Sequence, residues 1–377
     1  MVLVFRLEEL LLERRSGKKK RGVIRDIVKN TGLPRHKVAA LYHSNVRYIS
    51  LETLSLICDY LVEEVNIDAS LLPGILFARD PSDFWEILAT RSRLDIALGV
   101  RSDKSQPDRS ELRWVVAPDA MLLGELRHQI SLVRANSDSE REPQLTAEQL
   151  IDAPRLGPWR EQIGIDARNR YGEFADARQK HALVCLGTIK SNPLVEMVVS
   201  SVFGSDAFVS MDQEPHRTQW PCPFVLQYRA KDPQPPSCFA GTKAIPPIVD
   251  SAPGIFFEEE PNKWVCCPCT DRLDAALIFY AFRRAEGSLE VVLGGFSARS
   301  THYLANALKN LKGTLLKPRY ESNALQVGAV VVRFECVETA SGHNEVTCKP
   351  FPLTRDVLAK YISRKQRRGR NDRRTKP

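Results

Sequence analysis

The stretch RGVIRDIVKNTGLPRHKVAALYHSNVRYISLETLSLICDYL, residues 21–61, decides how the first part of the chain folds. Apolar side chains recur at helical spacing on either side of one glycine. Ile27 precedes Gly32, and Val38 and Leu41 follow it, three residues apart. A tight turn between two helices needs a residue that adopts positive φ, and glycine does so at no steric cost. The pattern therefore predicts two helices joined by a turn at Gly32.

Further helices are predicted on both sides of this pair. Pro34 pre-sets the backbone for a second helix over residues 34–42, since proline is favoured at the first helical position. Ser50 is a typical cap for the next helix, whose apolar face is formed by Leu51, Leu54, Leu56, Ile57 and Leu61. Residues 3–15 carry leucines on one face, at positions 3, 7, 10 and 11, and this spacing predicts an amphipathic helix. Together these segments predict a small all-α bundle.

The positive charge of the chain lies at its two ends. Residues 1–50 hold 12 Lys and Arg against four acidic residues, and residues 355–377 hold 10 against two. The formal net charge of the whole chain is +8, so the middle carries a net negative charge. This asymmetry indicates a polyanionic partner, with nucleic acid the first candidate and an anionic membrane surface the second. The alternative is that the basic ends only favour solubility.

Residues 3–72 resemble the Cro/C1 or Xre-type helix-turn-helix family, in which about five helices form a compact bundle. With Gly32 as the turn glycine, Ile27 stands at the apolar position before it, Leu33 follows it, and Val38 and Leu41 take the two core positions of the second helix. The run ISLETLSLICDYL resembles the fourth helix of that family. The resemblance implies binding to double-stranded DNA. The alternative is a protein-docking bundle with a solvated basic face.

The resemblance also implies roles for particular side chains. A recognition helix presents the exposed residues of its first two turns to base edges in the major groove. The expected base-contacting residues are Arg35, His36, Lys37 and Ala40. Arg35 has the geometry to form two hydrogen bonds with guanine. The expected phosphate-contacting residues, which position the protein without reading sequence, are Lys18, Lys19, Lys20, Arg21, Asn45, Arg47 and Tyr48.

The composition is that of a soluble globular protein of two or three domains. The chain has 377 residues, of which 43% are hydrophobic and 27% are charged. No apolar run approaches the roughly 20 residues that a membrane-spanning helix requires, and the first 15 residues do not read as a signal peptide. We therefore expect a cytoplasmic protein whose nine cysteines are thiols. A metal site at Cys266, Cys267 and Cys269 is the less favoured alternative.

The rest of the chain predicts an α/β domain with a mixed or mostly parallel, Rossmann-like sheet. We expect a helix-turn-helix domain over residues 1–72, a linker over 73–92, the α/β domain over 93–354 and a basic disordered tail over 355–377. Apolar β-rich runs predict strands at 93–101, 112–117, 224–229, 275–283 and 328–337. Helices are predicted at 118–132 and 162–180.

Two segments repeat one plan. Residues 181–203, HALVCLGTIKSNPLVEMVVSSVF, and residues 288–311, SLEVVLGGFSARSTHYLANALKNL, each read as a strand, a small polar turn and a helix. Such turns hold anions or nucleotides in many α/β folds, because backbone N–H groups and a helix dipole converge there. The candidate ligand-binding residues are Gly187, Ser191, Asn192, Gly294, Gly295, Ser297, Arg299 and Ser300. The turns equally suit plain architecture, since neither contains G-x-G-x-x-G.

These features predict a DNA-binding transcriptional regulator. Its α/β domain would sense a small anionic or nucleotide ligand or drive assembly into a homodimer, with no cofactor expected. One alternative is a nucleotide- or NAD-processing effector enzyme, for example in phage defence, with a helix-turn-helix domain for DNA localisation or autoregulation. A second alternative is a protein-interaction scaffold. No residue is assigned as catalytic, because no spacing in the sequence links a nucleophile to a base.

Overall fold

The computed structural model describes most of the chain as two compact units. The described residues are 3–5, 7, 10–11, 22–43, 46, 48–69, 72, 76–79, 84–102, 113–135, 144–177, 180–210, 220–242, 252–311, 316–322, 325–338 and 344–362. The first unit comprises Met1–Ser82 with Arg283–Gly287 and Ser322–Ala324. The second comprises Asp83–Phe282, Ser288–Glu321 and Leu325–Pro377.

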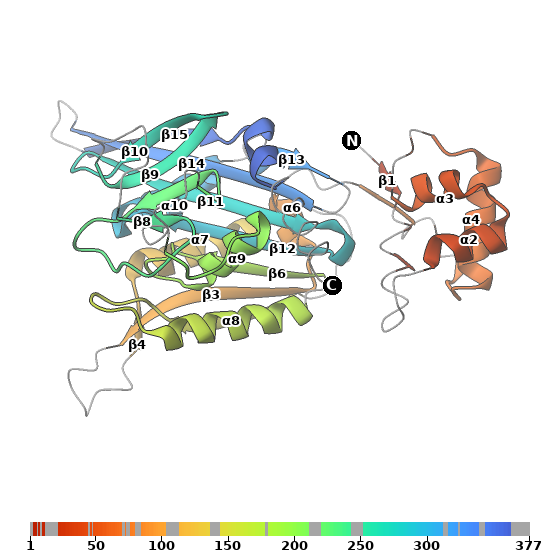
Figure 1. Ribbon diagram of the computed structural model, residues 1–377, viewed down its shortest axis with the longest axis horizontal. Coiled ribbons are helices and arrows are strands. Elements are labelled where there is room, and N and C mark those ends of the chain that lie inside the picture. The colour runs from red at the N-terminus through yellow and green to blue at the C-terminus, as the bar shows by residue number, and fades with distance from the viewer. Residues whose placement is uncertain are drawn as a thin grey trace, which may run out of the picture. The chain divides into compact units, whose positions relative to one another are not determined.

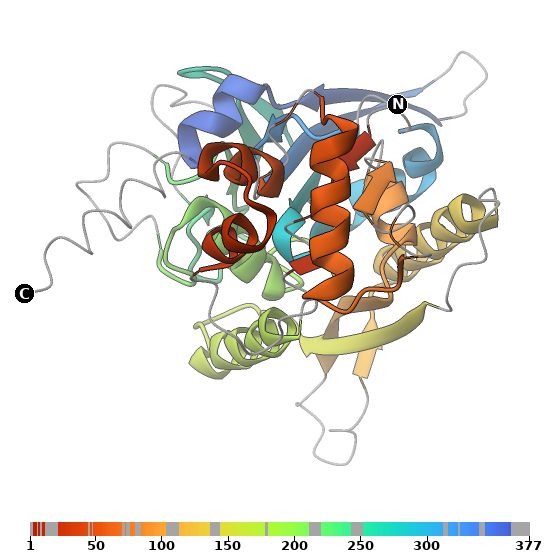
Figure 2. The same cartoon turned by 90° about the vertical axis from the view of Figure 1, so that its right-hand side faces the viewer.

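The first unit is a helical bundle. The helices with described bounds are α2 (Val23–Thr31), α3 (Arg35–Tyr42) and α4 (Leu51–Glu63), which Figure 2 shows grouped together. Ile27, Val38 and Ile57, one from each helix, are fully buried in a shared apolar core. Apolar residues at helical spacing on three elements thus enclose one core, as the sequence pattern predicts.

The start of the chain corrects one expectation. Residues 3–5 were expected in a helix, but Leu3–Phe5 is a strand, β1, antiparallel to β2 (Phe77–Arg79). Leu7, Leu10 and Leu11 are helical and buried, as the amphipathic pattern predicts. A short apolar run fits the period of a helix as well as that of a strand, and here the hydrogen bonding with β2 stabilises the strand.

The second unit is an α/β domain built on a nine-stranded mixed sheet. Its central parallel strands are β12 (Ser288–Gly295), β6 (His181–Leu186), β3 (Arg93–Ser102) and β5 (Leu145–Asp152), in that order. Figure 1 shows β12, β6 and β3 side by side. β4 (Arg113–Val115) pairs antiparallel with β3. Beyond β12 lie β11 (Leu273–Arg283) and β14 (Leu325–Glu338), and β14 pairs antiparallel with β13 (Tyr320–Glu321) and β15 (Asn344–Pro352).

Both faces of this sheet are buried. One face packs against α6 (Phe84–Ala89), α7 (Ala117–Ala135) and α10 (Ala298–Ala307). The other packs against α8 (Glu161–Asp176), α9 (Leu194–Phe203), a helix at 355–362 and a four-stranded sheet. That sheet has the order β10 (Lys263–Pro268), β9 (Gly254–Glu260), β7 (Phe224–Gln227) and β8 (Ala240–Gly241). Burial on both faces explains why the central strands are nearly continuous apolar runs.

The expected linker and tail contain regular structure. Residues 73–92, expected as a linker, include β2 and α6, and Phe84 of α6 is fully buried in the core of the second unit. Residues 355–362, expected to begin a disordered tail, form a helix whose Val357 and Leu358 are fully buried. The remainder of the predicted tail lies outside the described residues. Among the described residues, no helix is long and apolar enough to cross a membrane.

The helix at 355–362 is held by a buried carboxylate. Glu258 of β9 is fully buried and accepts hydrogen bonds from Lys360 Nζ and from the hydroxyl of Tyr361. It also accepts a hydrogen bond from the backbone N–H of Asn262. A buried carboxylate is tolerated where it is paired and hydrogen-bonded in this way. The contact fixes the helix to the smaller sheet.

Candidate DNA-binding surface and strand-end cluster

The turn between α2 and α3 is built by local chemistry. Gly32 has φ 66°, the left-handed conformation expected of it, and its N–H donates to Val28 O at 3.0 Å. Thr31 Oγ1 donates to Ile27 O at 2.7 Å and accepts from the N–H of Leu33 at 3.3 Å. Pro34 occupies the cap position of α3 with ψ 137°, so the helix begins at Arg35, one residue later than the expected start at Pro34. These contacts fix the direction in which α3 leaves the turn.

Helix α3 has two chemically distinct faces. Val38 and Leu41 are buried in the core at 0% and 1% exposure. Arg35, His36 and Lys37 are exposed, and their side chains form no hydrogen bond or ion pair with another described residue. The first turn of α3 therefore presents two free cationic side chains and an imidazole to solvent.

Helix α4 supports the pair formed by α2 and α3. Ser50 caps it, as the sequence predicts, with its Oγ accepting from the N–H of Thr53 at 3.3 Å. Tyr60 of α4 donates its hydroxyl to Asp26 Oδ2 of α2 at 3.2 Å. α4 thereby holds α2, and α2 positions α3 through the turn.

This arrangement agrees with a family comparison. Residues 6–64 match the family model of the Cro/C1-type HTH DNA-binding domain. Residues 6–64 are a Cro/C1-type helix-turn-helix domain. No curated protein and no solved structure matches the chain. The Cro/C1-type domain supports DNA as a partner of this chain, and α3 is the second helix of its helix-turn-helix pair.

The predicted DNA contacts of the Cro/C1-type domain fall into two groups. Of the base-contacting residues, Arg35, His36 and Lys37 share the exposed face of α3, and Ala40 is half-buried. Of the phosphate-contacting residues, Tyr48 is 88% exposed. The others lie outside the described residues: Lys18, Lys19, Lys20, Arg21, Asn45 and Arg47. Contact with DNA stays a prediction for each of them.

In the second unit, three glycines lie in register at the carboxyl ends of parallel strands. Leu98 of β3, Leu186 of β6 and Leu293 of β12 are paired, so Gly99, Gly187 and Gly294 follow at one level. A Cβ at Gly99 would lie 1.9 Å from Ser191 O, and one at Gly294 would lie 2.3 Å from Gly187 C. The absence of side chains lets the turn after β6 lie directly across the strand ends.

The polar residues of the turn after β6 support that turn. Asn192 is fully buried and donates to Ala97 O at 3.0 Å and to Leu186 O at 3.1 Å. Its Oδ1 accepts from the N–H of Leu194. Ser191 Oγ donates to Thr188 O at 3.3 Å. Asn192 thus ties β3, β6 and α9 together.

The turn after β12 is held in the same way. Ser297 and Ser300 form a capping box at the start of α10, and Ser297 Oγ donates to Asp274. Arg299 donates to the carbonyl oxygens of Asp271 and Leu273. The structure therefore brings the two predicted polar turns to one edge of the sheet, with these side chains engaged in holding the edge. Ligand binding by them stays a prediction.

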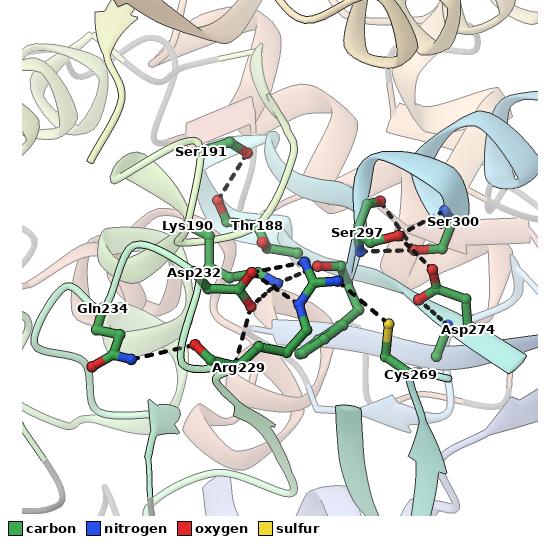
Figure 3. A network of polar contacts seen from close by, with 12 residues as sticks. Thr188, Lys190, Ser191, Arg229, Asp232, Gln234, Cys269, Asp274, Ser297 and Ser300 are labelled. Atoms are coloured by element: carbon green, nitrogen blue, oxygen red, sulfur yellow. Dashed lines mark hydrogen bonds and ion pairs between the residues drawn. The ribbon is translucent and has the colours of Figure 1, made fainter. Parts of the chain in front are cut away.

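A charged group at this edge was missed by the sequence analysis. We call Lys190, Arg229, Asp232 and Cys269 the strand-end cluster (Figure 3). Lys190 Nζ lies 3.0 Å from Asp232 Oδ2, and Arg229 donates to Asp232 Oδ1 through Nε at 2.9 Å and Nη2 at 2.7 Å. Arg229 Nη1 lies 3.7 Å from Cys269 Sγ. The only sequence signal was the position of Lys190 in a turn after a buried strand.

Burial shapes the ionisation of this cluster. It lowers the pKa of Lys190 to about 8, even though the attraction of Asp232 opposes the shift. Burial alone would raise the pKa of Asp232, but the hydrogen bonds and charges of Arg229 and Lys190 outweigh it and lower that pKa. Burial, with the charge of Asp274, raises the pKa of Cys269. At neutral pH the cluster thus holds two cations, one carboxylate and a neutral thiol.

Of the three cysteines named as an alternative metal site, Cys266 and Cys267 lie on opposite faces of one strand. Cys266 and Cys267 are neighbours on β10, and successive side chains of a strand point to opposite faces. Cys267 is buried in the large core, whereas Cys266 packs against Val225 and Phe256 on the other face of the smaller sheet. Because of this alternation, the pair does not converge on one ion with Cys269. Within the described ranges, no group of three or more His, Cys, Asp or Glu side chains could hold a metal.

Proposed function

We propose that this protein is a sequence-specific DNA-binding transcriptional regulator. The observation that carries the proposal is the free, cationic first turn of α3 in a Cro/C1-type domain. Arg35 reads guanine through two hydrogen bonds, and Lys37 adds a less specific contact in the same groove. Tyr48 and the basic residues before α2 contact phosphates and set the position of α3.

The second unit supplies the regulation in this proposal. One Cro/C1-type domain presents one recognition helix, and an operator with two half-sites needs two such helices about one helical turn apart. The α/β unit forms a homodimer that fixes this spacing. A small anionic or nucleotide ligand that binds the two dimer arrangements with different affinity then changes operator affinity.

Direct binding measurements test the proposal. We expect the full-length protein to retard a DNA fragment from its own upstream region more strongly than random DNA of equal length. The affinity should fall steeply with salt concentration, because bound phosphates release counterions. Arg35→Ala should lower specific affinity by about 1–3 kcal/mol and leave nonspecific binding nearly unchanged.

A matched variant shows whether Arg35→Ala weakens binding because a base contact is lost or only because the protein loses one positive charge. Arg160→Ala removes an exposed arginine from the second unit and should leave specific binding intact. Circular dichroism of both variants confirms that the fold is retained. Equal affinity for every genomic fragment and for random DNA would contradict the proposal.

A further inference from the structure

The strand-end cluster, together with the neighbouring pair of Arg299 and Asp274, carries one more positive charge than its carboxylates neutralise. Arg299 pairs with Asp274, whose carboxylate lies 3.4 Å from the guanidinium. Lys190 and Arg229 share the single carboxylate of Asp232. Among the described residues in these contacts, three cations thus face two carboxylates. A positive charge in excess of its paired carboxylates, held in a partly buried site, favours an additional anion.

The hydrogen bonds of the cluster leave donors available. Both oxygens of Asp232 are occupied, Oδ1 by two guanidinium donors and Oδ2 by Lys190 and the backbone N–H of Arg229. Arg229 has five N–H donors, of which two reach Asp232 and one is directed at the thiol of Cys269. A thiol is a weak acceptor, and no other described residue accepts from Nη1.

Asp232 and Phe296 hold the two cations in place. Lys190 Nζ donates to the carbonyl oxygen of Phe296 and lies 3.6 Å from the centroid of its ring. The guanidinium of Arg229 lies 5.4 Å from the same ring. The side chain of Lys190 is 9% exposed and that of Arg229 is 27% exposed, so solvent reaches Arg229 more readily than Lys190. An anion that arrives from solvent therefore meets two cations, Arg229 and Lys190, that are already held in position.

The three cations act on the position of Cys269. Burial and the charge of Asp274 oppose a negative charge there, whereas Arg229, Arg299 and Lys190 favour one, and Arg229 Nη1 lies 3.7 Å from Cys269 Sγ. We propose that a small oxyanion binds to the guanidinium of Arg229 beside Cys269. The oxyanion is either free phosphate or the phosphate group of a small metabolite. Lys190, the more buried cation, adds its positive charge to the site. Planar guanidinium suits phosphate because two N–H groups contact two oxygens. This inference does not depend on DNA binding by the first unit.

Two substitutions at one position test the site. Cys269→Asp places a carboxylate where the oxyanion would bind, whereas Cys269→Ser changes the side chain without adding charge. Inorganic phosphate at constant ionic strength, adjusted with sodium chloride, should raise the melting temperature of the full-length protein and of Cys269→Ser by mass action. Cys269→Asp should melt higher without phosphate and bind phosphate at least about tenfold more weakly. An equal phosphate response in both variants would overturn the site.

A second measurement uses the unchanged protein. Phosphate should slow the alkylation of Cys269, measured by peptide mass spectrometry, and leave that of the exposed Cys348 unchanged. A 5′-mononucleotide that protects Cys269 at lower concentration than phosphate would identify a phosphorylated metabolite as the ligand. Stronger protection by phosphate would identify the free ion. No protection by either would overturn the proposal.

The pH dependence gives an independent readout. Lys190 faces Asp232, Arg229 and Cys269, and its pKa of about 8 means that it loses its charge as pH rises through 8. Sulfate keeps its charge over this range and serves as the probe. Its affinity should fall between pH 7 and pH 9 in the full-length protein. An affinity that is constant over this range would show that Lys190 does not contribute.

Discussion

Gly294 follows the last paired residue of β12 and lies against the backbone of the turn after β6. A Cβ at this position would lie 2.3 Å from both C and O of Gly187 and 2.8 Å from the N of Thr188. These are backbone atoms, which cannot rotate away as a side chain would. The close approach of two strand ends therefore requires glycine here.

We predict that Gly294→Ala destabilises the second unit by about 3 kcal/mol, because the added methyl forces the two strand ends apart. Gly172→Ala in α8 is the matched control, since a Cβ there meets nothing within 4 Å. That control should stabilise the helix by roughly 0.5–1 kcal/mol. Urea denaturation measures both changes, and equal stability of the two variants would contradict the predicted close approach.

Asp119 is a buried carboxyl group in the first turn of α7. Its burial raises its pKa to about 6, and the charge of Arg101 only partly offsets the shift. A carboxyl whose folded-state pKa is raised binds more protons in the folded state than in the unfolded state. Its contribution to stability therefore falls as pH rises from about 4 to about 6 and stays low above that range.

We predict that Asp119→Asn raises the free energy of unfolding at pH 7 by roughly 3 kcal/mol, because the amide carries no charge to desolvate. The advantage over the unchanged protein should shrink as pH is lowered towards 4. Denaturation series at several pH values measure this difference. Asp206→Asn, at an exposed site, should show no such trend, and a pH-independent effect of Asp119→Asn would refute the assignment.

At the level of elements, the helix at 355–362 depends on Glu258. The carboxylate is fully buried and is contacted by Lys360 and Tyr361. We predict that Glu258→Gln lowers the free energy of unfolding by about 3 kcal/mol, since it removes the counter-charge of the Lys360 ammonium. Hydrogen exchange should become faster across residues 355–362.

The neighbouring residue provides the control for this change. Glu259 pairs with Lys263 at 2.9 Å, but both side chains are more than a third exposed, so Glu259→Gln should change stability by less than about 1 kcal/mol. If both variants retain slow exchange across residues 355–362, the buried carboxylate does not fix that helix.

Elements whose signal is local could be predicted from the sequence. The turn at Gly32 and the two faces of α3 follow from residues within a few positions of one another. The strand β1 could not be predicted, because its apolar residues fit a helix as well and its partner β2 lies more than 70 residues later. The hairpin of β9 and β10 and the edge strands β5 and β15 were missed, since they do not alternate cleanly between apolar and polar residues.

The candidate sites differ in the same way, since one is formed by neighbouring residues and the other by residues far apart in the sequence. Arg35, His36 and Lys37 could be named from the sequence because one helix carries them all. The strand-end cluster could not, because its contacts are distant in the chain. Lys190 is 42 residues from Asp232 and 106 from Phe296. The two predicted polar turns lie at the edge of the sheet where the cluster is found, but the folded chain determines which charges meet there (Figure 3).

On the scale of the whole molecule, the two units carry different parts of the proposed function. In this proposal the Cro/C1-type domain would contribute the DNA-reading surface, and the α/β unit would contribute assembly and an anion-responsive edge. Coupling between them requires that the ligand distinguish two arrangements of the dimer, since a ligand with equal affinity for both changes nothing.

Genome-wide DNA occupancy of the tagged full-length protein tests the central claim, sequence-specific regulation through α3, most directly. We predict discrete occupied sites that share one sequence motif and lie upstream of genes. Arg35→Ala, expressed at the same level, should lose these sites. Occupancy spread evenly over the genome, or a set of sites unchanged by Arg35→Ala, would contradict the account.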